Sequence, residues 1–490
     1  MSSSSAFSLS SSSQKTLHSF ILILSVVIRG ILFYYEFDKS LEDEIHFSTP
    51  TTSFKRLKEG LFLSRIGQSP YSSSSFLQPP LTLAPFALAD QLASTFSTHH
   101  ERNLQLWMYR FIFIISDLVV AFFVYGIAKN SELLLQPFYK RVTTAGTSNT
   151  TTNRASRNLP QENTPSQNLP IFLMSLYLLN PVMIGSCVSM STIVFNNLSI
   201  AGAIYFATKS NIVSSTLFLA FGSYLTLYPI TLLVGIILIV RSLKLRRNEP
   251  ANMFAISGKS IIMLLFWTCC LHYASISLLE SIRGGDSLEA KTTIPTDTII
   301  YPFLSSTLGT VIGIERLNIL YEYCYQCYYY PFTLQDLTPN WGTMWYFFTE
   351  VFNDFKAFFL LIFHLHAFIY VIPLTLRFKN DGLFWCLIQT AIISVFKAYP
   401  CLGDFYFYMT LLLLFIHISQ HMRYGFFIVS MLLASLFVGP ICFNTWIHKG
   451  TGNANFFYFV TLIFLVGNIL LIVEFVFARL KATHLYKKNQ

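Results

Sequence analysis

The sequence predicts an all-α fold, a polytopic bundle of about 12 transmembrane helices, and two observations carry this prediction. Hydrophobic residues make up 53% of the 490-residue chain and charged residues only 12%, whereas a soluble globular protein carries about 25% charged residues. The net charge of +9 comes from basic residues in short segments between apolar runs. That arrangement follows the positive-inside rule of membrane proteins and argues against a soluble nucleic-acid-binding protein.

A membrane span needs roughly 20 apolar residues. The apolar runs that meet or approach this length are 17–35, 106–128, 170–187, 192–208, 212–227, 228–243, 259–282, 346–376, 382–399, 404–420, 424–442 and 456–480. Asn180-Pro181 and Tyr228-Pro229 interrupt the middle runs. Because broken helices at membrane depth are tolerated only where they face protein or a water-filled space, Asn180 and Tyr228 are predicted to border an internal cavity.

The chain divides into a single transmembrane domain, residues 17–480, and two short ends. Residues 1–16 are Ser-rich and are predicted to be a disordered cytoplasmic N-terminus. Residues 481–490 are predicted to be a cytoplasmic tail. Within the domain, 36–78 is predicted to be a luminal loop whose amphipathic piece, 54–63, could lie on the membrane surface. Segment 129–169 is predicted to be a flexible cytoplasmic linker, and 283–345 a second luminal loop.

The orientation depends on segment 79–97, which is apolar but short. If it spans the membrane, the basic linker 129–169 lies outside; if it enters and returns, the linker lies inside. The positive-inside rule favours the second arrangement, which makes both termini cytoplasmic. The N-glycosylation sequon at Asn149 is then expected to stay unmodified.

The run from Asp336 to Phe348 marks a predicted membrane boundary. Pro339 and Gly342 stop regular structure, and the amphipathic rings of Trp341 and Trp345 prefer the membrane–water interface. An apolar helix is predicted to follow directly and to continue to about residue 376.

The first luminal loop carries an acidic cluster, Asp38, Glu42, Asp43 and Glu44. A carboxylate in such a loop can take a proton from an acceptor or bind a metal ion, as in lipid-linked glycosyltransferases of the GT-C class. The cluster is followed by Ile45-His46-Phe47, without the Asp-containing pattern expected of an active enzyme, so it is predicted to be a solvated acidic turn.

Neither the histidines nor the cysteines predict a metal or a cofactor. His364 and His366 are two residues apart and point to different sides of a helix, so both are predicted to be polar positions inside the bundle. His417 and His421 have the spacing of a zinc pair but no acidic neighbour. Cys324 and Cys327 form a lone C-x-x-C, predicted to be free thiols or a local disulfide.

Charged residues within apolar runs are costly and are functional candidates by default. They are Arg29, Asp117, Glu350, Asp354, Lys397, Asp404 and Glu474. Lys397 and Asp404 flank a turn with Pro and Gly, where either a salt-bridged luminal corner or a functional site is expected.

The last loop combines Gly450, Gly452, Asn453 and Asn455 with aromatic neighbours. Small residues allow close backbone approach, and amide side chains both donate to and accept from sugar hydroxyls or phosphate oxygens. The alternative is that the asparagines cap a helix. At the chain's end, Lys487 and Lys488 have the spacing of a dilysine signal for retrieval to the endoplasmic reticulum.

Two sets of motifs carry a family resemblance. Gly60, Gly67, Ser69-Pro70-Tyr71 and Pro79-Pro80-Leu81 occur in the order found in GPI mannosyltransferases and in the PIG-U family, which indicates a GT-C-like scaffold. The chain resembles PIG-U most strongly, from about residue 20 to 484. The matching segments are 69–71, 224–229, 336–352, 396–404 and 446–458.

The resemblance to PIG-U implies a non-catalytic subunit of GPI transamidase that binds and presents the GPI lipid in the endoplasmic reticulum membrane. It implies a cysteine-protease-like catalytic subunit and PIG-T-, PIG-S- and GPI-anchor-attachment-type subunits as partners, and no cofactor. The lipid-binding residues expected on this basis are Asn453, Asn455, Trp446, Phe456 and Phe457. The alternatives are a GT-C-type mannosyltransferase of GPI biosynthesis, which needs the acidic cluster, and a membrane transporter, suggested by the broken helices.

Overall fold

The computed structural model describes residues 11–96, 101–144, 168–283 and 313–488. All regular elements in these ranges are helical, which confirms the predicted all-α class. The α-helices are α1(Ser11–Tyr34), α2(Phe37–Leu41), α3(Phe54–Arg65), α4(Ala84–Phe96), α5(Glu101–Thr144), α6(Leu169–Leu179), α7(Pro181–Val188), α8(Ile193–Thr208), α9(Ile212–Leu225), α10(Leu232–Arg246), α11(Met253–Arg283), α14(Ile314–Cys324), α15(Tyr330–Phe332), α16(Met344–Glu350), α17(Asn353–Ile369), α18(Val371–Phe378), α19(Gly382–Phe396), α20(Leu402–Leu412), α21(Gly425–Ile447) and α22(Ala454–Lys488). The shorter or wider turns are η1(Pro80–Thr82), η2(Tyr228–Thr231), η3(Tyr325–Tyr329) and η4(Leu413–His421).

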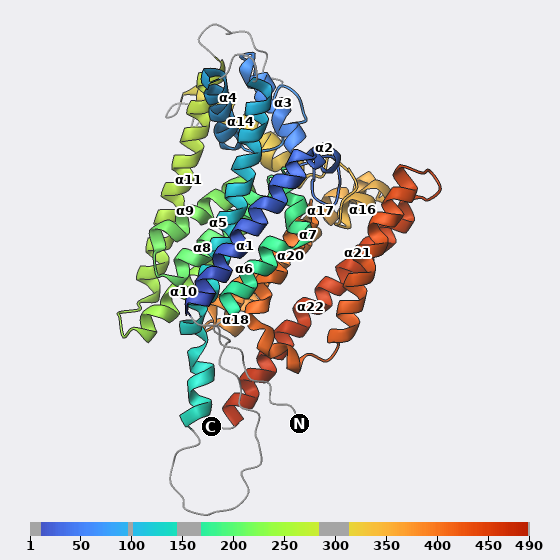
Figure 1. Ribbon diagram of the computed structural model, residues 1–490. Coiled ribbons are helices and arrows are strands. Elements are labelled where there is room, and N and C mark those ends of the chain that lie inside the picture. The colour runs from blue at the N-terminus through green and yellow to red at the C-terminus, as the bar shows by residue number, and fades with distance from the viewer. Residues whose placement is uncertain (1–10, 97–100, 145–167, 284–312, 489–490) are drawn as a thin grey trace, which may run out of the picture.

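The long helices run side by side along one axis and form an elongated bundle (Figure 1). The short helices α2, α3, α4, α14 and α16 gather at the end that is uppermost in Figure 1, here called the upper end. The start of α1 and the end of α22 lie at the opposite, lower end, as does the turn between α10 and α11.

Each predicted span coincides with one helix or with two or three consecutive helices. In the described ranges, eight helices are long and apolar enough to cross a membrane, and α6 and α7 form a further pair bent by 52°. The remaining three, α8, α9 and α19, have only 14 to 16 residues. At 1.5 Å per residue they are shorter than the ~30 Å hydrocarbon core. The polytopic fold is shown, while the count of twelve complete spans remains a prediction.

The predicted helix over 346–376 is wrong in one respect, because it is broken near its start. α16 ends at Glu350, Val351 is extended with ψ of 139°, and α17 begins at Asn353. Apolar character alone does not reveal this break; the polar residues Asn353 and Asp354 favour a new helix start there. α16 thus belongs to the upper end and α17 to the bundle (Figure 1).

Three other boundaries differ from the predicted ones. α5 continues to Thr144, so residues 129–144 of the predicted flexible linker are helical; the Glu132–Leu135 stretch consists of strong helix formers. α1 already begins at Ser11, and α22 extends to Lys488, so parts of both predicted terminal segments are helical. Asn149 and its sequon lie outside the described residues.

The described residues of segment 79–97 form η1 and the 13-residue α4, which packs against the first half of α5 at the upper end (Figure 1). Thirteen residues rise only about 20 Å, less than a membrane span needs. This geometry agrees with the arrangement in which the segment turns back, and it brings the start of α5 to the same end as α2 and α3.

The amphipathic piece predicted at 54–63 forms helix α3, capped by Ser53, which accepts a hydrogen bond from Arg56 N at 3.4 Å. Its apolar face is not on the outside. Phe54, Leu57 and Leu61 are buried against Phe86 and other core residues. The apolar stripe of α3 therefore packs into the protein core, whereas the sequence suggested that it could lie on the membrane surface.

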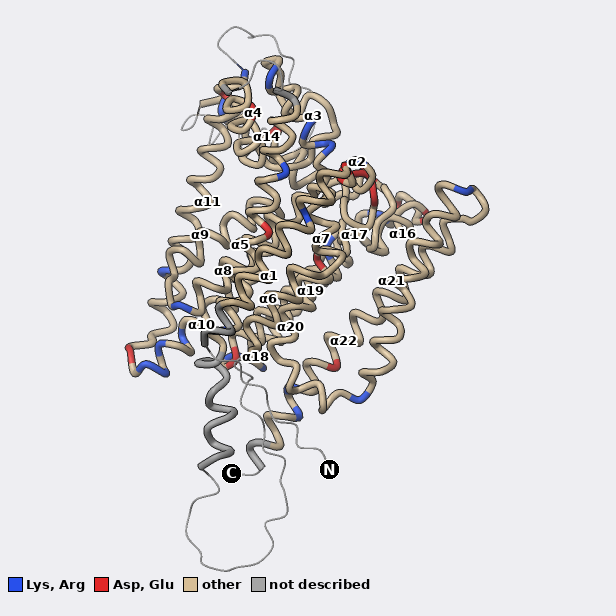
Figure 2. Tube along the Cα trace, in the orientation of Figure 1, with Lys and Arg blue, Asp and Glu red and all other residues tan. Residues whose placement is uncertain are grey.

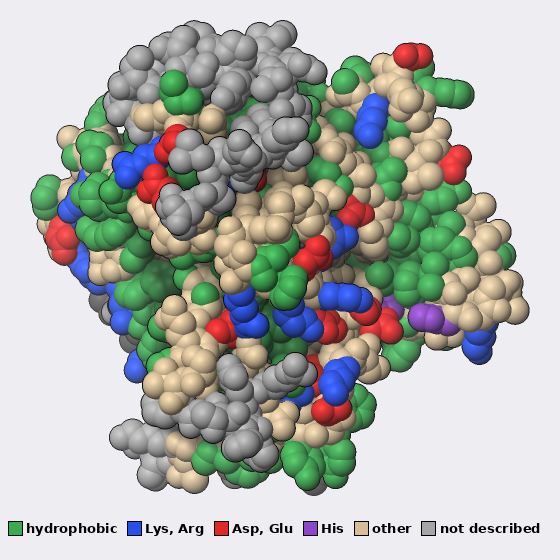
Figure 3. Space-filling view, turned by 90° about the horizontal axis from the view of Figure 1, so that it is seen from above, with side chains coloured by type: hydrophobic (Ala, Val, Ile, Leu, Met, Phe, Trp, Pro, Cys, Tyr) green, Lys and Arg blue, Asp and Glu red, His purple; other side chains and the backbone are tan. Residues whose placement is uncertain are grey.

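Charged side chains are distributed unequally over the two ends (Figure 2). The lower end carries mainly Lys and Arg, among them the group at the end of α10: Arg241, Lys244, Arg246 and Arg247. The upper end carries both signs, and Figure 3 shows them interspersed across its middle. The basic segments predicted to be cytoplasmic thus share one end. The assignment of that end to the cytoplasm remains a prediction.

Inside the bundle, a charged pair joins three helices. Arg29 of α1 donates to Asp117 of α5 at 2.5 Å, and both side chains are fully buried. Tyr177 of α6 donates to the other Asp117 oxygen at 2.8 Å. These two intramembrane charges of the sequence therefore satisfy each other and hold α1, α5 and α6 together, as buried charges require.

Candidate functional site

The loop between α21 and α22 lies at an outer corner of the upper end (Figure 1). Gly450 has φ of 63°, a conformation that favours glycine, so the chain can reverse tightly. Asn453 then caps α22: its side-chain oxygen accepts a hydrogen bond from Phe456 N at 3.3 Å. Asn453 therefore stabilises the start of α22.

Aromatic side chains join this loop to α16. We call the cluster the aromatic corner; it comprises Trp345, Tyr346, Trp446, Phe457 and Tyr458. Trp345 and Trp446 stack with ring centroids 6.0 Å apart, and Tyr346 stacks on Tyr458 at 4.4 Å. The Tyr346 hydroxyl also donates to the side-chain oxygen of Asn455. The fold thus brings together the two segments predicted to meet the membrane boundary.

The aromatic corner offers polar and apolar groups to a ligand. Asn455 and Lys449 are exposed, and Phe456 points outward with 60% of its surface exposed. Phe457 is fully buried and anchors the loop. The indole N–H of Trp345 is buried and has no hydrogen-bond partner among the described residues. The exposed amide and ammonium are both suited to phosphate or hydroxyl oxygens.

The run that precedes α16 is held by residues from the first loop. Asp336 pairs with Arg56 of α3 at 2.6 Å, and its main-chain oxygen accepts a hydrogen bond from the Tyr399 hydroxyl at 2.7 Å. Burial opposes ionisation of the Asp336 carboxyl, but hydrogen bonds from Thr338 and Arg56 hold its pKa below the usual value. The segment thereby joins α3 to the turn before α20.

Trp341, predicted to lie at the membrane boundary, is instead buried, with 2% of its surface exposed. Its indole N–H donates to His46 Nδ1 at 2.8 Å, and the His46 main-chain oxygen accepts from Leu402 N at 3.2 Å. Gly439 of α21 permits this packing, because a Cβ there would lie 2.6 Å from the Trp341 ring. His46 therefore ties together three segments of the upper end.

We expect a pH-dependent stability from His46. Burial lowers its pKa from 6.5 to about 4, so the unfolded chain binds more protons than the folded chain between these values. Stability is then fully present above pH 6.5 and falls as the pH drops towards 4, by at most about 3 kcal/mol. The measurement is the thermal unfolding midpoint of the purified protein at pH 7 and pH 5. His46→Asn keeps an acceptor for Trp341 and should flatten the pH dependence; an unchanged slope would contradict this assignment.

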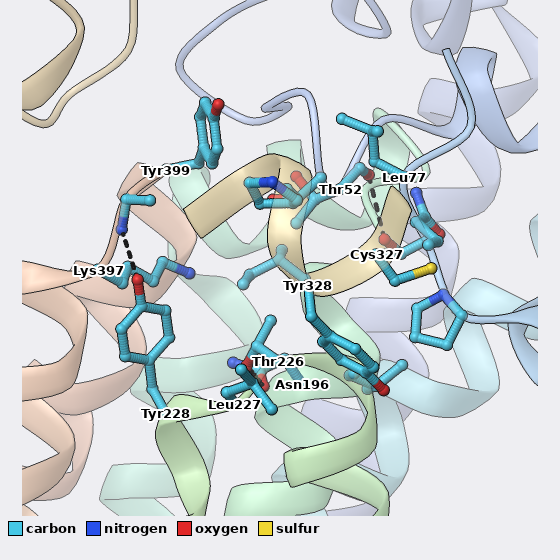
Figure 4. Close-up of a pocket in the computed structure, with 18 of the residues that line it drawn as sticks. Thr52, Leu77, Asn196, Thr226, Leu227, Tyr228, Cys327, Tyr328, Lys397 and Tyr399 are labelled. Atoms are coloured by element: carbon cyan, nitrogen blue, oxygen red, sulfur yellow. Dashed lines mark hydrogen bonds between the residues drawn. The ribbon is translucent and has the colours of Figure 1, made fainter. Parts of the chain in front are cut away.

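A cavity of about 60 Å³ lies below this region, between η2, η3 and the loop after α19 (Figure 4). Segments around residues 52, 78, 196, 226, 328 and 398 form its walls. Figure 4 shows Lys397 reaching in between Tyr399 and Tyr228, with Cys327 on the far side. Tyr228, which was predicted to border a cavity, and Lys397, which was predicted to flank a turn, therefore line the same cavity.

The wall around Lys397 is tightly connected. Lys397 pairs with Asp404 at 2.6 Å, so the ion pair expected for this turn is present. The Tyr228 hydroxyl accepts a hydrogen bond from Ala398 N at 3.2 Å and lies 3.2 Å from His364 Nδ1. The interruption at Tyr228-Pro229 thus positions a ring and a hydroxyl beside the turn.

Trp341, Trp345 and Asn180 lie outside this cavity. Trp341 borders a separate, smaller cavity with Pro400 and Phe405, and Trp345 borders neither. Asn180 is also outside both; its side chain accepts a hydrogen bond from Val182 N at 2.8 Å and caps α7. The break at Asn180 therefore serves the 52° bend between α6 and α7.

The prediction of a solvated acidic turn is wrong for Asp38. Its side chain is 2% exposed and forms a bidentate pair with Arg110 of α5, at 2.8 and 2.9 Å. Glu42 and Asp43 do lie nearer the surface, where they pair with Lys58 at 2.7 Å and with Lys55 at 3.0 Å. Sequence alone could not distinguish them, because Arg110 is 72 residues away from Asp38.

The remaining candidates have local partners. His364 is buried and its Nε2 lies 2.7 Å from the Phe332 oxygen; His366 Nδ1 lies 2.7 Å from the Ile362 oxygen. Cys324 and Cys327 are free thiols. In the described ranges, including His417 and His421, no group of three or more His, Cys, Asp or Glu side chains is arranged to hold a metal ion. Lys487 and Lys488 are the last residues of α22, and their retrieval role remains a prediction.

Three residues of the upper end were not predicted: His46, Arg56 and Gln78. His46 and Arg56 act on partners 295 and 280 positions away, and no local pattern encodes such a distance. Gln78 directly precedes the Pro79-Pro80 motif. Its position next to this motif was the one sequence feature that could have indicated a structural or functional role.

Comparison with known proteins identifies the family of the chain. The family model described as GPI transamidase subunit PIG-U matches residues 23–319 and 303–464. The human protein named GPI-anchor transamidase component PIGU is 29% identical over 471 residues, covering 94% of this chain and 93% of the human protein. The Cricetulus griseus protein of the same name is 29% identical over 474 residues, with 94% and 93% covered. GPI transamidase component GAB1 of Saccharomyces cerevisiae is 25% identical over 445 residues, with 90% and 89% covered. Since the matched segments span most of its length, this chain belongs to the PIG-U family of GPI transamidase subunits.

Proposed function

We propose that this protein is a non-catalytic subunit of a GPI transamidase complex and that it binds the GPI lipid and presents it for attachment to the C-terminus of precursor proteins. The membership of the chain in the PIG-U family supports the first part. The observation that carries the second is the contact between Tyr346 and Asn455. It joins two distant motifs into one surface, and we propose that this surface lies at the membrane boundary.

The chemistry of this surface fits an amphipathic glycolipid. Exposed Phe456 and half-buried Trp446 are rings of the kind that settle at the level of lipid head groups. Asn455 directly precedes Phe456, and Lys449 follows Trp446 by three residues. Both are exposed and offer hydrogen-bond donors and one positive charge to a phosphate or sugar. A lipid whose chains enter the bilayer at the rings would bring its head group to these polar side chains.

Two observations favour a non-catalytic role, the first against a mannosyltransferase and the second against an enzyme with a thiol nucleophile. The Asp38 carboxylate is tied to Arg110, so it is not available to accept a proton from a substrate. Burial also raises the pKa of the Cys324 thiol to about 12, so this group is not the thiolate that a nucleophile requires at neutral pH.

For the location, we propose the endoplasmic reticulum membrane, with both termini and the lower end in the cytoplasm and the upper end in the lumen. The basic residues at the lower end support this orientation. The partners we propose are the cysteine-protease-like catalytic subunit and the PIG-T-, PIG-S- and GPI-anchor-attachment-type subunits. α11 and the span formed by α17 and α18 are each only 17% buried over their most apolar stretch, which leaves apolar surface for lipid and for partner helices.

The test is expression of the tagged chain in cells that lack the native subunit. We expect it to co-purify with the catalytic subunit and to restore GPI-anchored proteins at the cell surface. Restoration without co-purification would contradict subunit membership. A purified chain that transfers mannose to a GPI precursor by itself would establish the mannosyltransferase alternative.

A further inference from the structure

The cavity around Lys397 has features that the proposed lipid contact at the aromatic corner does not use. Its walls come from six separate segments, including the loops at residues 52 and 78 and the break at residue 226 (Figure 4). Keeping such a space open costs packing contacts that a filled core would make. Polar side chains line this space, so they can form hydrogen bonds with a ligand.

One buried acceptor in this cavity lacks a donor. Gln78 is 3% exposed, and its amide nitrogen donates to the Ser53 oxygen at 3.0 Å. Its amide oxygen has no hydrogen-bond partner among the described residues. A buried acceptor without a donor destabilises the folded state, so a ligand that donates a hydrogen bond to this oxygen would remove that cost.

The charge of the cavity is balanced. Lys397 contributes an ammonium group, but Asp404 neutralises it at 2.6 Å. The other lining groups are uncharged and include Thr52, Asn196 and Thr226. A fully ionised phosphate would find no uncompensated positive charge here and has no proton for the Gln78 oxygen. A neutral hydroxyl-bearing ligand can both donate and accept.

The apolar part of the wall also suits a sugar. Tyr228 and Phe332 stack with centroids 5.7 Å apart at 18°, and both border the cavity. Aromatic rings pack well against the C–H face of a sugar ring. The volume of about 60 Å³ corresponds to roughly four to six water molecules, which is enough for the hydroxyl-bearing edge of one sugar residue but not for a chain of sugars.

We propose that this cavity binds a neutral hexose unit, through a sugar hydroxyl that donates to the Gln78 amide oxygen and another that accepts from Lys397 or Asn196. The inference rests on the proposed function only for the source of the hexose, which would be the glycan of the bound lipid. The cavity then serves as a second point of recognition, in addition to the aromatic corner.

The test uses the purified full chain in detergent and methyl α-mannopyranoside as the probe, with binding measured by saturation-transfer NMR. We expect transfer to the sugar ring protons, and we expect Gln78→Leu to reduce it at least fivefold. Gln326→Leu is the matched control, because Gln326 also has a buried amide oxygen without a described partner but does not border the cavity. It should bind the sugar as the unmodified chain does.

A second variant keeps the test decisive if Gln78→Leu fails to fold. Thr226→Phe fills the cavity from another wall, at a residue in extended backbone that accommodates an aromatic side chain, and should also abolish transfer. Equal transfer to all variants, or displacement of the sugar by equimolar inorganic phosphate, would overturn the proposal.

Since a soluble sugar and an isolated chain are used, failure here leaves the lipid contact of the aromatic corner untouched. Replacement of the purified complex's own glycolipid by the free sugar would identify the lipid glycan as the source.

Discussion

Asp38→Asn should greatly reduce the amount of folded protein. Removing one partner of a buried ion pair leaves the other charge uncompensated, at a cost of about 3–5 kcal/mol, comparable to much of the stability of an ordinary domain. Arg110 cannot reach water instead, because its guanidinium also lies over the rings of Phe33 and Trp107, at 5.3 and 4.9 Å. The measurement is the thermal unfolding midpoint and the yield of monodisperse protein after purification.

The same acidic cluster supplies a matched control. Asp43→Asn breaks an ion pair whose two side chains are both about two-thirds exposed, and it should change stability by no more than about 0.5 kcal/mol. Replacing both buried partners, Asp38→Leu with Arg110→Met, should recover part of the lost yield. If Asp38→Asn folds normally but abolishes GPI attachment, the carboxylate acts on substrate and the non-catalytic interpretation fails.

Asn455→Ala should weaken GPI attachment while the complex still assembles. A lost hydrogen bond to a phosphate oxygen costs about 1.5–3 kcal/mol, or roughly ten- to a hundredfold in affinity. The residue is exposed, so its removal disturbs little packing. The measurement is subunit co-purification together with surface GPI-anchored proteins, in cells that lack the native subunit.

Asn453→Ala is the contrasting variant. Its side chain caps α22, and the loss of a cap costs about 1 kcal/mol of stability, so assembly should fall in parallel with attachment. Tyr346→Phe removes the hydroxyl that binds Asn455 but leaves the amide, and should have a smaller effect than Asn455→Ala. Normal assembly with normal attachment in the Asn455 variant would remove this residue from the proposed site.

The contrast between Asn453 and Asn455 shows how far sequence reasoning reached at the site. The sequence and the family resemblance predicted a lipid contact for both asparagines, with a helix cap as the alternative. The cap at Asn453 depends on where α22 begins, and the contact of Asn455 depends on Tyr346 lying beside it, while the lipid contact stays a prediction. The contact between Tyr346 and Asn455 joins residues 109 positions apart, beyond the reach of any local pattern.

The all-α class and the positions of the bundle helices were determined by the sequence itself. A run of apolar residues must satisfy its own backbone hydrogen bonds in lipid, and a helix does so within the segment. Composition therefore suffices to locate α1, α21 or α22. The break at Val351 and the helical residues 129–144 depend on finer preferences that apolar character does not express.

Only the tertiary structure determined which polar residues are buried and which partners they contact. Asp38 and Asp43 occur in one acidic stretch, yet one is sealed against Arg110 and the other stays near the surface. Trp341 and Trp345 occur in one aromatic run, yet the first binds His46 in the interior and the second supports the aromatic corner. The physical reason is that the energy of a buried charge or hydrogen-bonding group depends on the partner that it contacts. Those partners lie on helices that only folding brings together.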